Sequence, residues 1–150
     1  MSEIERIRDQ LRRAYSGDAW HGPSLKEVLE GVDADTASAR PIADAHSIRE
    51  LVLHIVAWEK EAIRRVRGEG SDLPPEEDWP DGADAWTALL EELDASHVRL
   101  MEKLAELDDS QLDSAVIGTG GTVYHLLHGV VQHNLYHGGQ IVLLRRAASA

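Results

Sequence analysis

Three serines in this chain each precede a glutamate by three residues, a spacing that marks the first turn of a helix. The pairs are Ser2 and Glu5, Ser24 and Glu27, and Ser47 and Glu50. In this capping box the serine hydroxyl accepts a hydrogen bond from a backbone N–H of the first turn, and the glutamate accepts one from the backbone N–H of the serine. Apolar residues then recur at helical spacing, and no segment shows a convincing run of strand alternation. The sequence therefore predicts an all-α fold.

Helix boundaries follow from the capping signals, the apolar spacing and the glycine and proline breaks. Five helices are expected, over about residues 3–16, 25–31, 48–68, 84–107 and 123–147. The four longer ones are most simply packed as a four-helix bundle. Residues 32–46, 68–82 and 108–121 are expected to be loops, and the acidic stretch Glu76-Glu77-Asp78 is expected to be solvated. Since two of these connections are long, the helices need not alternate simply up and down.

Composition limits the possible partners and chemistry. The chain has 27 acidic and 15 basic side chains, a formal net charge of −12 with histidine neutral, so nucleic acid and anionic membranes are not expected partners. It contains no cysteine, which excludes disulfides, thiolate ligands and a cysteine nucleophile. With 43% hydrophobic residues, we expect one domain spanning residues 1–150. No secretory core or bilayer-spanning run is present, so a cytoplasmic location is expected.

The segment from Gly129 to Arg145 carries the strongest functional signal. His133 and His137 stand four residues apart in an apolar helical pattern, which places both imidazoles on one helix face. This spacing suits two nitrogen ligands of one metal ion, while the competing interpretation is a pair of core-edge histidines satisfied by hydrogen bonds. Asn134 stands where a zinc peptidase has its glutamate, which disfavours peptidase chemistry. The same helix is apolar on a second side, so we expect it to be central or shared with another subunit.

Two ligands are too few for a tight site, and spacing alone does not identify a third. His54 lies at the margin of the apolar stripe of its helix, but nothing local shows that this helix faces the histidine pair. His21, in the turn Trp20-His21-Gly22-Pro23, is a candidate for a supporting contact to a ligand or substrate at the mouth of the bundle. The other histidines are expected in the core, on the surface or in a loop; they are His46, His97, His125 and His128.

Several segments resemble the DinB-like metal-binding four-helix bundles, a family related to the bacillithiol- and mycothiol-dependent S-transferases of bacteria. They are residues 20–25, 46–48 followed by 53–59, and 133–141, of which the last is the most specific. The resemblance covers nearly the whole chain. It implies an up-down-down-up bundle, a frequent homodimer and a divalent metal, often Zn²⁺ or Ni²⁺. One histidine of the second long helix and two of the last hold the metal in that family, which maps onto His54, His133 and His137.

The resemblance leaves three functional hypotheses open. The leading one is a metal-dependent S-transferase that activates a low-molecular-weight thiol cosubstrate for attack on an electrophilic small molecule, which requires no cysteine in the protein. The second is a hydrolase that uses metal-activated water. The third is a non-catalytic homodimer in which the metal staples two helices together. DNA binding is not implied by the family, and the net charge of −12 agrees with this.

Overall fold

The computed structural model describes residues 1–70, 72–82, 84–118 and 120–150, and its regular structure is helical. The long helices are α1 (Glu3–Ser16), α4 (Ile48–Val66), α6 (Trp86–Ala105) and α7 (Val123–Ala148). Three short α-helices are α2 (Leu25–Leu29), α3 (Ala34–Ser38) and α5 (Pro75–Asp78), and a 3₁₀ turn, η1, covers Asp109–Gln111. Within these ranges the β-type pairing recorded is one isolated bridge, between Ala115 and Thr122. The predicted all-α fold is confirmed.

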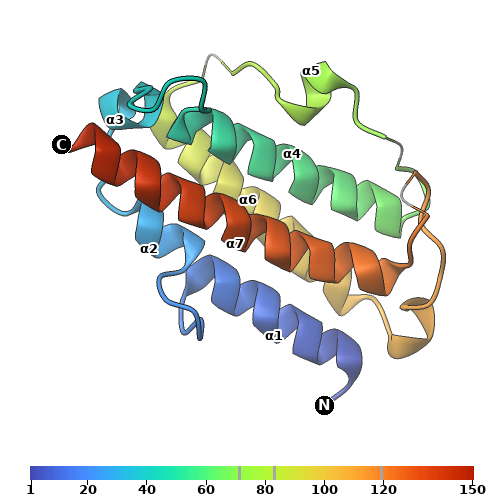
Figure 1. Cartoon of the computed structure of the whole chain (residues 1–150). Helices are drawn as coiled ribbons and strands as arrows, with labels where there is room; N and C mark the ends of the chain where they lie inside the picture. Colours follow the sequence, from blue (N-terminus) through green and yellow to red (C-terminus); the bar gives the residue numbers. More distant parts are fainter. Residues whose placement is uncertain (71, 83, 119) are drawn as a thin grey trace.

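The four long helices form a bundle with up-down-down-up order (Figure 1). Helices α1 and α7 run in one direction, and α4 and α6 run in the other. Because α4 and α6 are parallel, the chain must return along the whole bundle between them, and the segment that contains α5 does so over the outer side of α4. The long crossover that the sequence predicted is therefore required by the parallel direction of α4 and α6.

All three capping boxes form as expected at the starts of α1, α2 and α4. Two short helices lie in segments that were expected to be loops. Asp33 caps α3 by accepting a hydrogen bond from the backbone of Thr36, and Pro75 occupies the first position of α5, where its missing N–H costs nothing. Both helices have five residues or fewer, too few to give a periodic apolar pattern.

Helix α7 is the central helix of the bundle. It packs against α4 on one side and against α1 and α2 on another. Val131 contacts the core cluster that contains Ile4 and Ile7 of α1, and Val142 contacts the cluster that contains Leu25 of α2. The second apolar side of α7 is thus partly covered within the chain. No helix among the described residues is long and apolar enough to cross a membrane.

Two neighbouring leucines of α7 test how much this packing contributes to stability. Leu144 is 4% exposed in the core, whereas Leu143 is 60% exposed. We expect Leu144→Ala to lower the free energy of unfolding by about 2–5 kcal/mol, because it leaves a cavity. The same change at Leu143 should alter it by less than about 0.5 kcal/mol. Urea unfolding followed by circular dichroism measures the free energy of unfolding of both variants. Equal losses of stability in the two variants would contradict a position of α7 in which Leu144 faces the core and Leu143 faces solvent.

Candidate metal centre

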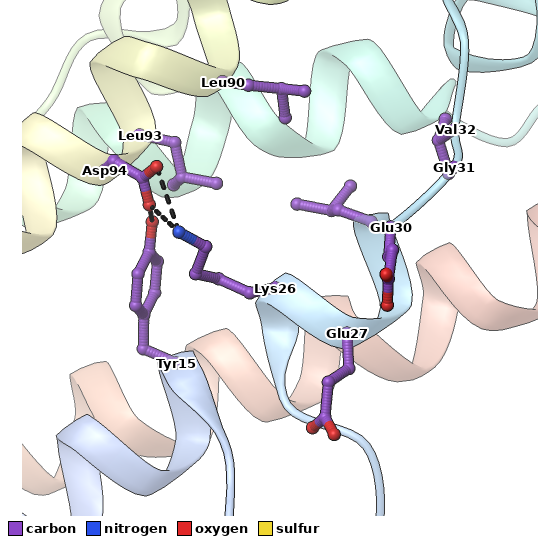
Figure 2. A pocket seen from close by; sticks show the side chains of 10 residues that line it. Tyr15, Lys26, Glu27, Glu30, Gly31, Val32, Leu90, Leu93 and Asp94 are labelled. Atoms are coloured by element: carbon purple, nitrogen blue, oxygen red, sulfur yellow. Dashed lines mark hydrogen bonds and ion pairs between the residues drawn. The ribbon is translucent and has the colours of Figure 1, made fainter.

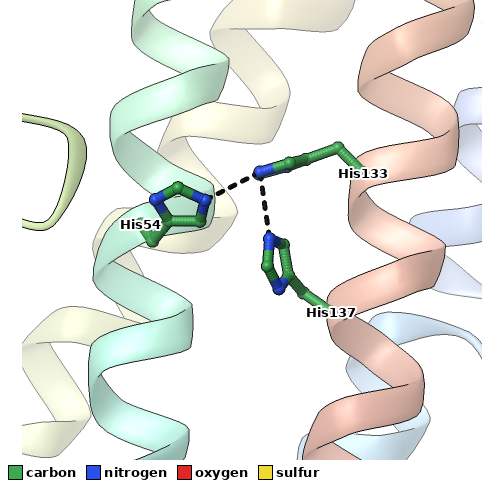
Figure 3. Close-up of side chains that lie close together, drawn as sticks. All are labelled: His54, His133 and His137. Atoms are coloured by element: carbon green, nitrogen blue, oxygen red, sulfur yellow. Dashed lines mark hydrogen bonds between the residues drawn. The ribbon is translucent and has the colours of Figure 1, made fainter. Parts of the chain in front are cut away.

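Three histidines from two helices converge on one point between α4 and α7 (Figure 3). His54 comes from α4, and His133 and His137 come from successive turns of α7. The Nε2 atom of His133 lies 3.0 Å from Nε2 of His54 and 3.1 Å from Nε2 of His137. The structure therefore brings together the three side chains that the family resemblance indicated.

Hydrogen bonds on the far side of two rings fix where their lone pairs point. Nδ1 of His54 lies 2.6 Å from the backbone carbonyl oxygen of Asp78, and Nδ1 of His137 lies 2.6 Å from the amide oxygen of Gln140. Both oxygens only accept, so Nδ1–H is the donor in each ring. The Nε2 atoms consequently carry lone pairs, and both lie at the cluster. This is the tautomer that a metal-binding histidine needs.

His133 is held in its neutral form by its surroundings. Burial lowers the pKa of His133 to about 3, and the neighbouring rings of His137 and His54 contribute to this lowering. Burial also lowers the pKa of His137. Since Nε2 of His133 has at most one proton, it can donate to only one of the two lone pairs that face it. Imidazoles whose nitrogens converge in this way are a donor set that Zn²⁺, Ni²⁺ and similar ions favour.

Two of the three nitrogen separations also fit a metal ion, and the three ligand atoms all lie within 4.8 Å of one another. Metal–nitrogen bonds of about 2.0–2.1 Å in tetrahedral geometry place ligand nitrogens about 3.3 Å apart, close to the 3.0 and 3.1 Å found here. Among the described residues no fourth histidine or carboxylate joins this cluster. An ion held by it would keep a position for a ligand from outside, which is the pattern of catalytic rather than structural sites.

The crossover between α4 and α6 covers His54. Trp79 stacks on the ring of His54 at 3.9 Å between centroids, and His46 stacks on the other side of Trp79 at 3.5 Å. The carboxylate of Asp78 accepts a hydrogen bond of 2.7 Å from Nε1 of Trp58. The prediction that Glu76-Glu77-Asp78 is a solvated loop is therefore wrong for Asp78, which is partly buried and contacts the site.

A buried carboxylate lies in the layer next to the cluster. Glu59 is 0% exposed and accepts hydrogen bonds from the hydroxyl of Ser96 at 2.8 Å and from the side-chain amide of Asn134 at 3.3 Å. Nδ1 of His97 is 3.5 Å from the same carboxylate. These contacts link α4, α6 and α7 directly beside His133, the residue before Asn134. Glu59 belongs to residues 53–59, one of the segments that resemble the DinB-like family. Its hydrogen-bond partners, Ser96 and Asn134, lie far away in sequence, so spacing did not identify this group of contacts.

The cluster adjoins a groove of about 430 Å³. His54 and His133 line it, together with Trp58 of α4 and with Leu126, Gly129 and Val130 of α7. Its polar lining also includes His125, an exposed residue as predicted for the surface. The groove gives a small molecule access to His54 and His133, the two clustered histidines that line it.

Another hollow lies between α1, α2 and α6, away from the histidine cluster (Figure 2). The hydroxyl of Tyr15 donates to Asp94 at 2.5 Å, and the ammonium of Lys26 lies 2.8 Å from the same carboxylate. Burial raises the pKa of Tyr15 well above its ordinary value. Because these polar groups already pair with one another, the histidine cluster is the stronger candidate for chemistry.

The remaining histidines do not join the cluster. His97 is buried and stacks on Tyr15 at 3.7 Å, as expected for a core residue, and His128 packs against Tyr124. His21 is exposed in the turn between α1 and α2, and it is not among the described residues that contact the three rings. The supporting contacts come instead from Asp78, Trp79 and Gln140. Gln140, three residues after His137 on the same face, is the one that helical spacing could have identified.

The lowered pKa of His133 predicts how acid affects the metal-free protein. Between about pH 6.5 and pH 3 the unfolded chain protonates this histidine and the folded chain does not, so the unfolded state binds more protons and stability falls as pH falls. From pH 7 to 5.5 the free energy of unfolding should drop by about 1 kcal/mol more in the wild type than in His133→Gln, which has no imidazole to protonate. Urea unfolding in the presence of a chelator measures the free energy of unfolding of both proteins at each pH. If this free energy falls equally with pH in the wild type and in His133→Gln, His133 is not neutral in the folded protein.

Comparison with known proteins gives a family match. Neither a curated protein nor a solved structure matches the chain. The family model described as the DinB superfamily matches residues 8–141, a range that contains all four long helices in whole or in large part and all three clustered histidines. The chain therefore belongs to the DinB superfamily.

Proposed function

We propose that His54, His133 and His137 hold a divalent metal ion, Zn²⁺ or Ni²⁺, and that the protein is a metal-dependent S-transferase. The observation that carries the proposal is the convergence of three Nε2 atoms beside a groove, with two of the tautomers fixed by outer hydrogen bonds. Membership of the DinB superfamily supports it. A bound ion would supply Lewis acidity that lowers the pKa of a thiol at its open position.

The reaction joins a low-molecular-weight thiol to an electrophilic small molecule. The sulfur forms a bond to the electrophilic carbon, the leaving group departs with its electron pair, and the thiol proton passes to solvent. Because the chain has no cysteine, the sulfur must come from a cosubstrate. Asp78 and Gln140 keep the imidazoles of His54 and His137 in the required tautomer, and Trp79 covers one face of His54.

Metal content tests the ligand assignment. We expect wild-type protein purified without added metal to hold one equivalent, and His54→Ala, His133→Ala and His137→Ala to hold far less. Each should weaken affinity by more than about 100-fold, since losing an outer partner of a ligand alone costs about 10–100-fold. Elemental analysis with a competing chelator measures both quantities. His128→Ala, on the same helix and outside the cluster, is the control. Equally low metal in wild type and variants would refute the site.

Catalysis is tested separately, by transfer from several cellular thiols to monochlorobimane. Metal-loaded wild type should accelerate formation of the fluorescent thioether with at least one thiol, and chelation or His137→Ala should abolish the acceleration. Reloading with Zn²⁺ or Ni²⁺ should restore it in the wild type alone. If no thiol is transferred while metal removal only lowers the melting temperature, the ion is structural and the transferase proposal fails.

A further inference from the structure

Gly129 stands in the interior of α7, where glycine is the least favourable residue apart from proline. A Cβ at this position would meet no atom within 4 Å among the described residues, apart from its chain neighbours and the backbone of its own helix. Neither a close approach nor a positive φ within the chain therefore requires a glycine here. Gly138 and Gly139 of α7 share this property, and the feature that sets Gly129 apart from them is that it lines the groove.

The position of Gly129 relates it to the metal site. Gly129, His133 and His137 follow one another at intervals of four residues, so they share one face of α7. Gly129 lines the groove that His54 and His133 also line. The absence of a side chain there keeps open the space one turn before the first of the two clustered α7 histidines.

The opposite side of this groove is aromatic and fixed in place. Trp58 donates its indole N–H to Asp78, and the guanidinium of Arg65 lies 5.2 Å from the centre of its ring. Arg65 is itself buried and bonded to Glu61 at 2.9 Å, and Asp78 is engaged with Trp58. The charged side chains that line the groove thus have partners within the protein, so a charged ligand group that does not reach the metal position would lose water without gaining a dedicated counter-ion.

We propose that this groove binds the electrophilic substrate through a flat, uncharged, apolar group, which lies between Trp58 and the bare backbone at Gly129. The proposal rests on the transferase function and adds the class of its acceptor substrate. Aromatic and apolar surfaces provide most of the affinity of small-molecule sites, and the convergent polar groups here are the histidines. Gly129 then determines how bulky an acceptor the site admits.

Substitutions at two glycines of α7 distinguish an effect on ligand binding in the groove from the general effect of replacing a glycine within a helix. Gly139→Ala is the matched control, because a Cβ at Gly139 would likewise meet no described atom within 4 Å, yet Gly139 does not line the groove. Both Gly129→Ala and Gly139→Ala should raise the melting temperature by about 2–4 °C, since alanine favours the helix. Both should keep the metal content of the wild type.

Ligand binding should distinguish the two positions. The probe is 1-chloro-2,4-dinitrobenzene, measured by equilibrium dialysis with metal-loaded protein and no thiol; the chain has no cysteine that could react with it. We expect Gly129→Ala to weaken binding several-fold and Gly129→Leu at least about tenfold, while Gly139→Ala and Gly139→Leu leave it unchanged. Binding that is unchanged in both Gly129 variants would overturn the proposal.

A charged analogue tests the class of ligand. In protein kept free of metal by a chelator, the groove should bind 4-chloro-3,5-dinitrobenzoate at least about tenfold more weakly than the uncharged probe, because its carboxylate would be desolvated without a dedicated counter-ion. Metal is removed for this comparison because a bound cation would itself attract the carboxylate. Equal or tighter binding of the benzoate overturns the uncharged class. If the protein holds no metal but the Gly129 variants bind the probe more weakly, the transferase function is refuted and the proposed binding groove stands. If thiol transfer depends on metal but the Gly129 variants bind the probe as the wild type does, the transferase function stands and the proposed binding groove is refuted.

Discussion

Three imidazoles that meet between two helices, two of them buried and His133 partly buried, impose a hydrogen-bonding requirement that the rest of this structure satisfies only in part. A neutral imidazole has one donor and one acceptor nitrogen, and leaving either unpaired in the interior is costly. The backbone of Asp78 and the side chain of Gln140 accept from two of the rings, which leaves the three Nε2 atoms directed at one another. Their lone pairs cannot all be satisfied by protons shared among three neutral rings. A divalent cation bound by all three nitrogens would resolve this conflict.

The topology of the bundle supplies these outer contacts. Parallel α4 and α6 require a crossover that returns along the bundle, and this crossover brings Asp78 and Trp79 against His54. A bundle with short turns between antiparallel neighbours would have no segment in this position. This long connection therefore orients His54 and, through Asp78, forms part of the groove wall.

Local signals in the sequence predicted what is local in the structure. Capping boxes marked the starts of α1, α2 and α4, and the four-residue interval placed His133 and His137 on one face. The position of His54 opposite them depends on how two helices pack, so spacing left it open and only the family resemblance indicated it. The contacts of Asp78 with His54 and of Glu59 with Asn134 span 24 and 75 residues and carry no periodic signal. Helices α3 and α5 are likewise too short to be marked by periodicity.

Among the four long helices, α7 is the longest, and its composition is the least favourable for helix formation. Four histidines and three glycines lie within its 26 residues, and the glycines alone cost about 3 kcal/mol relative to alanine. Burial of Leu127, Ile141 and Leu144 contributes about 1.5–3 kcal/mol for each side chain. Because α7 is covered by α1, α2 and α4, its stability comes from packing rather than from propensity. The central position is therefore what allows one helix to carry two clustered histidines and an open groove.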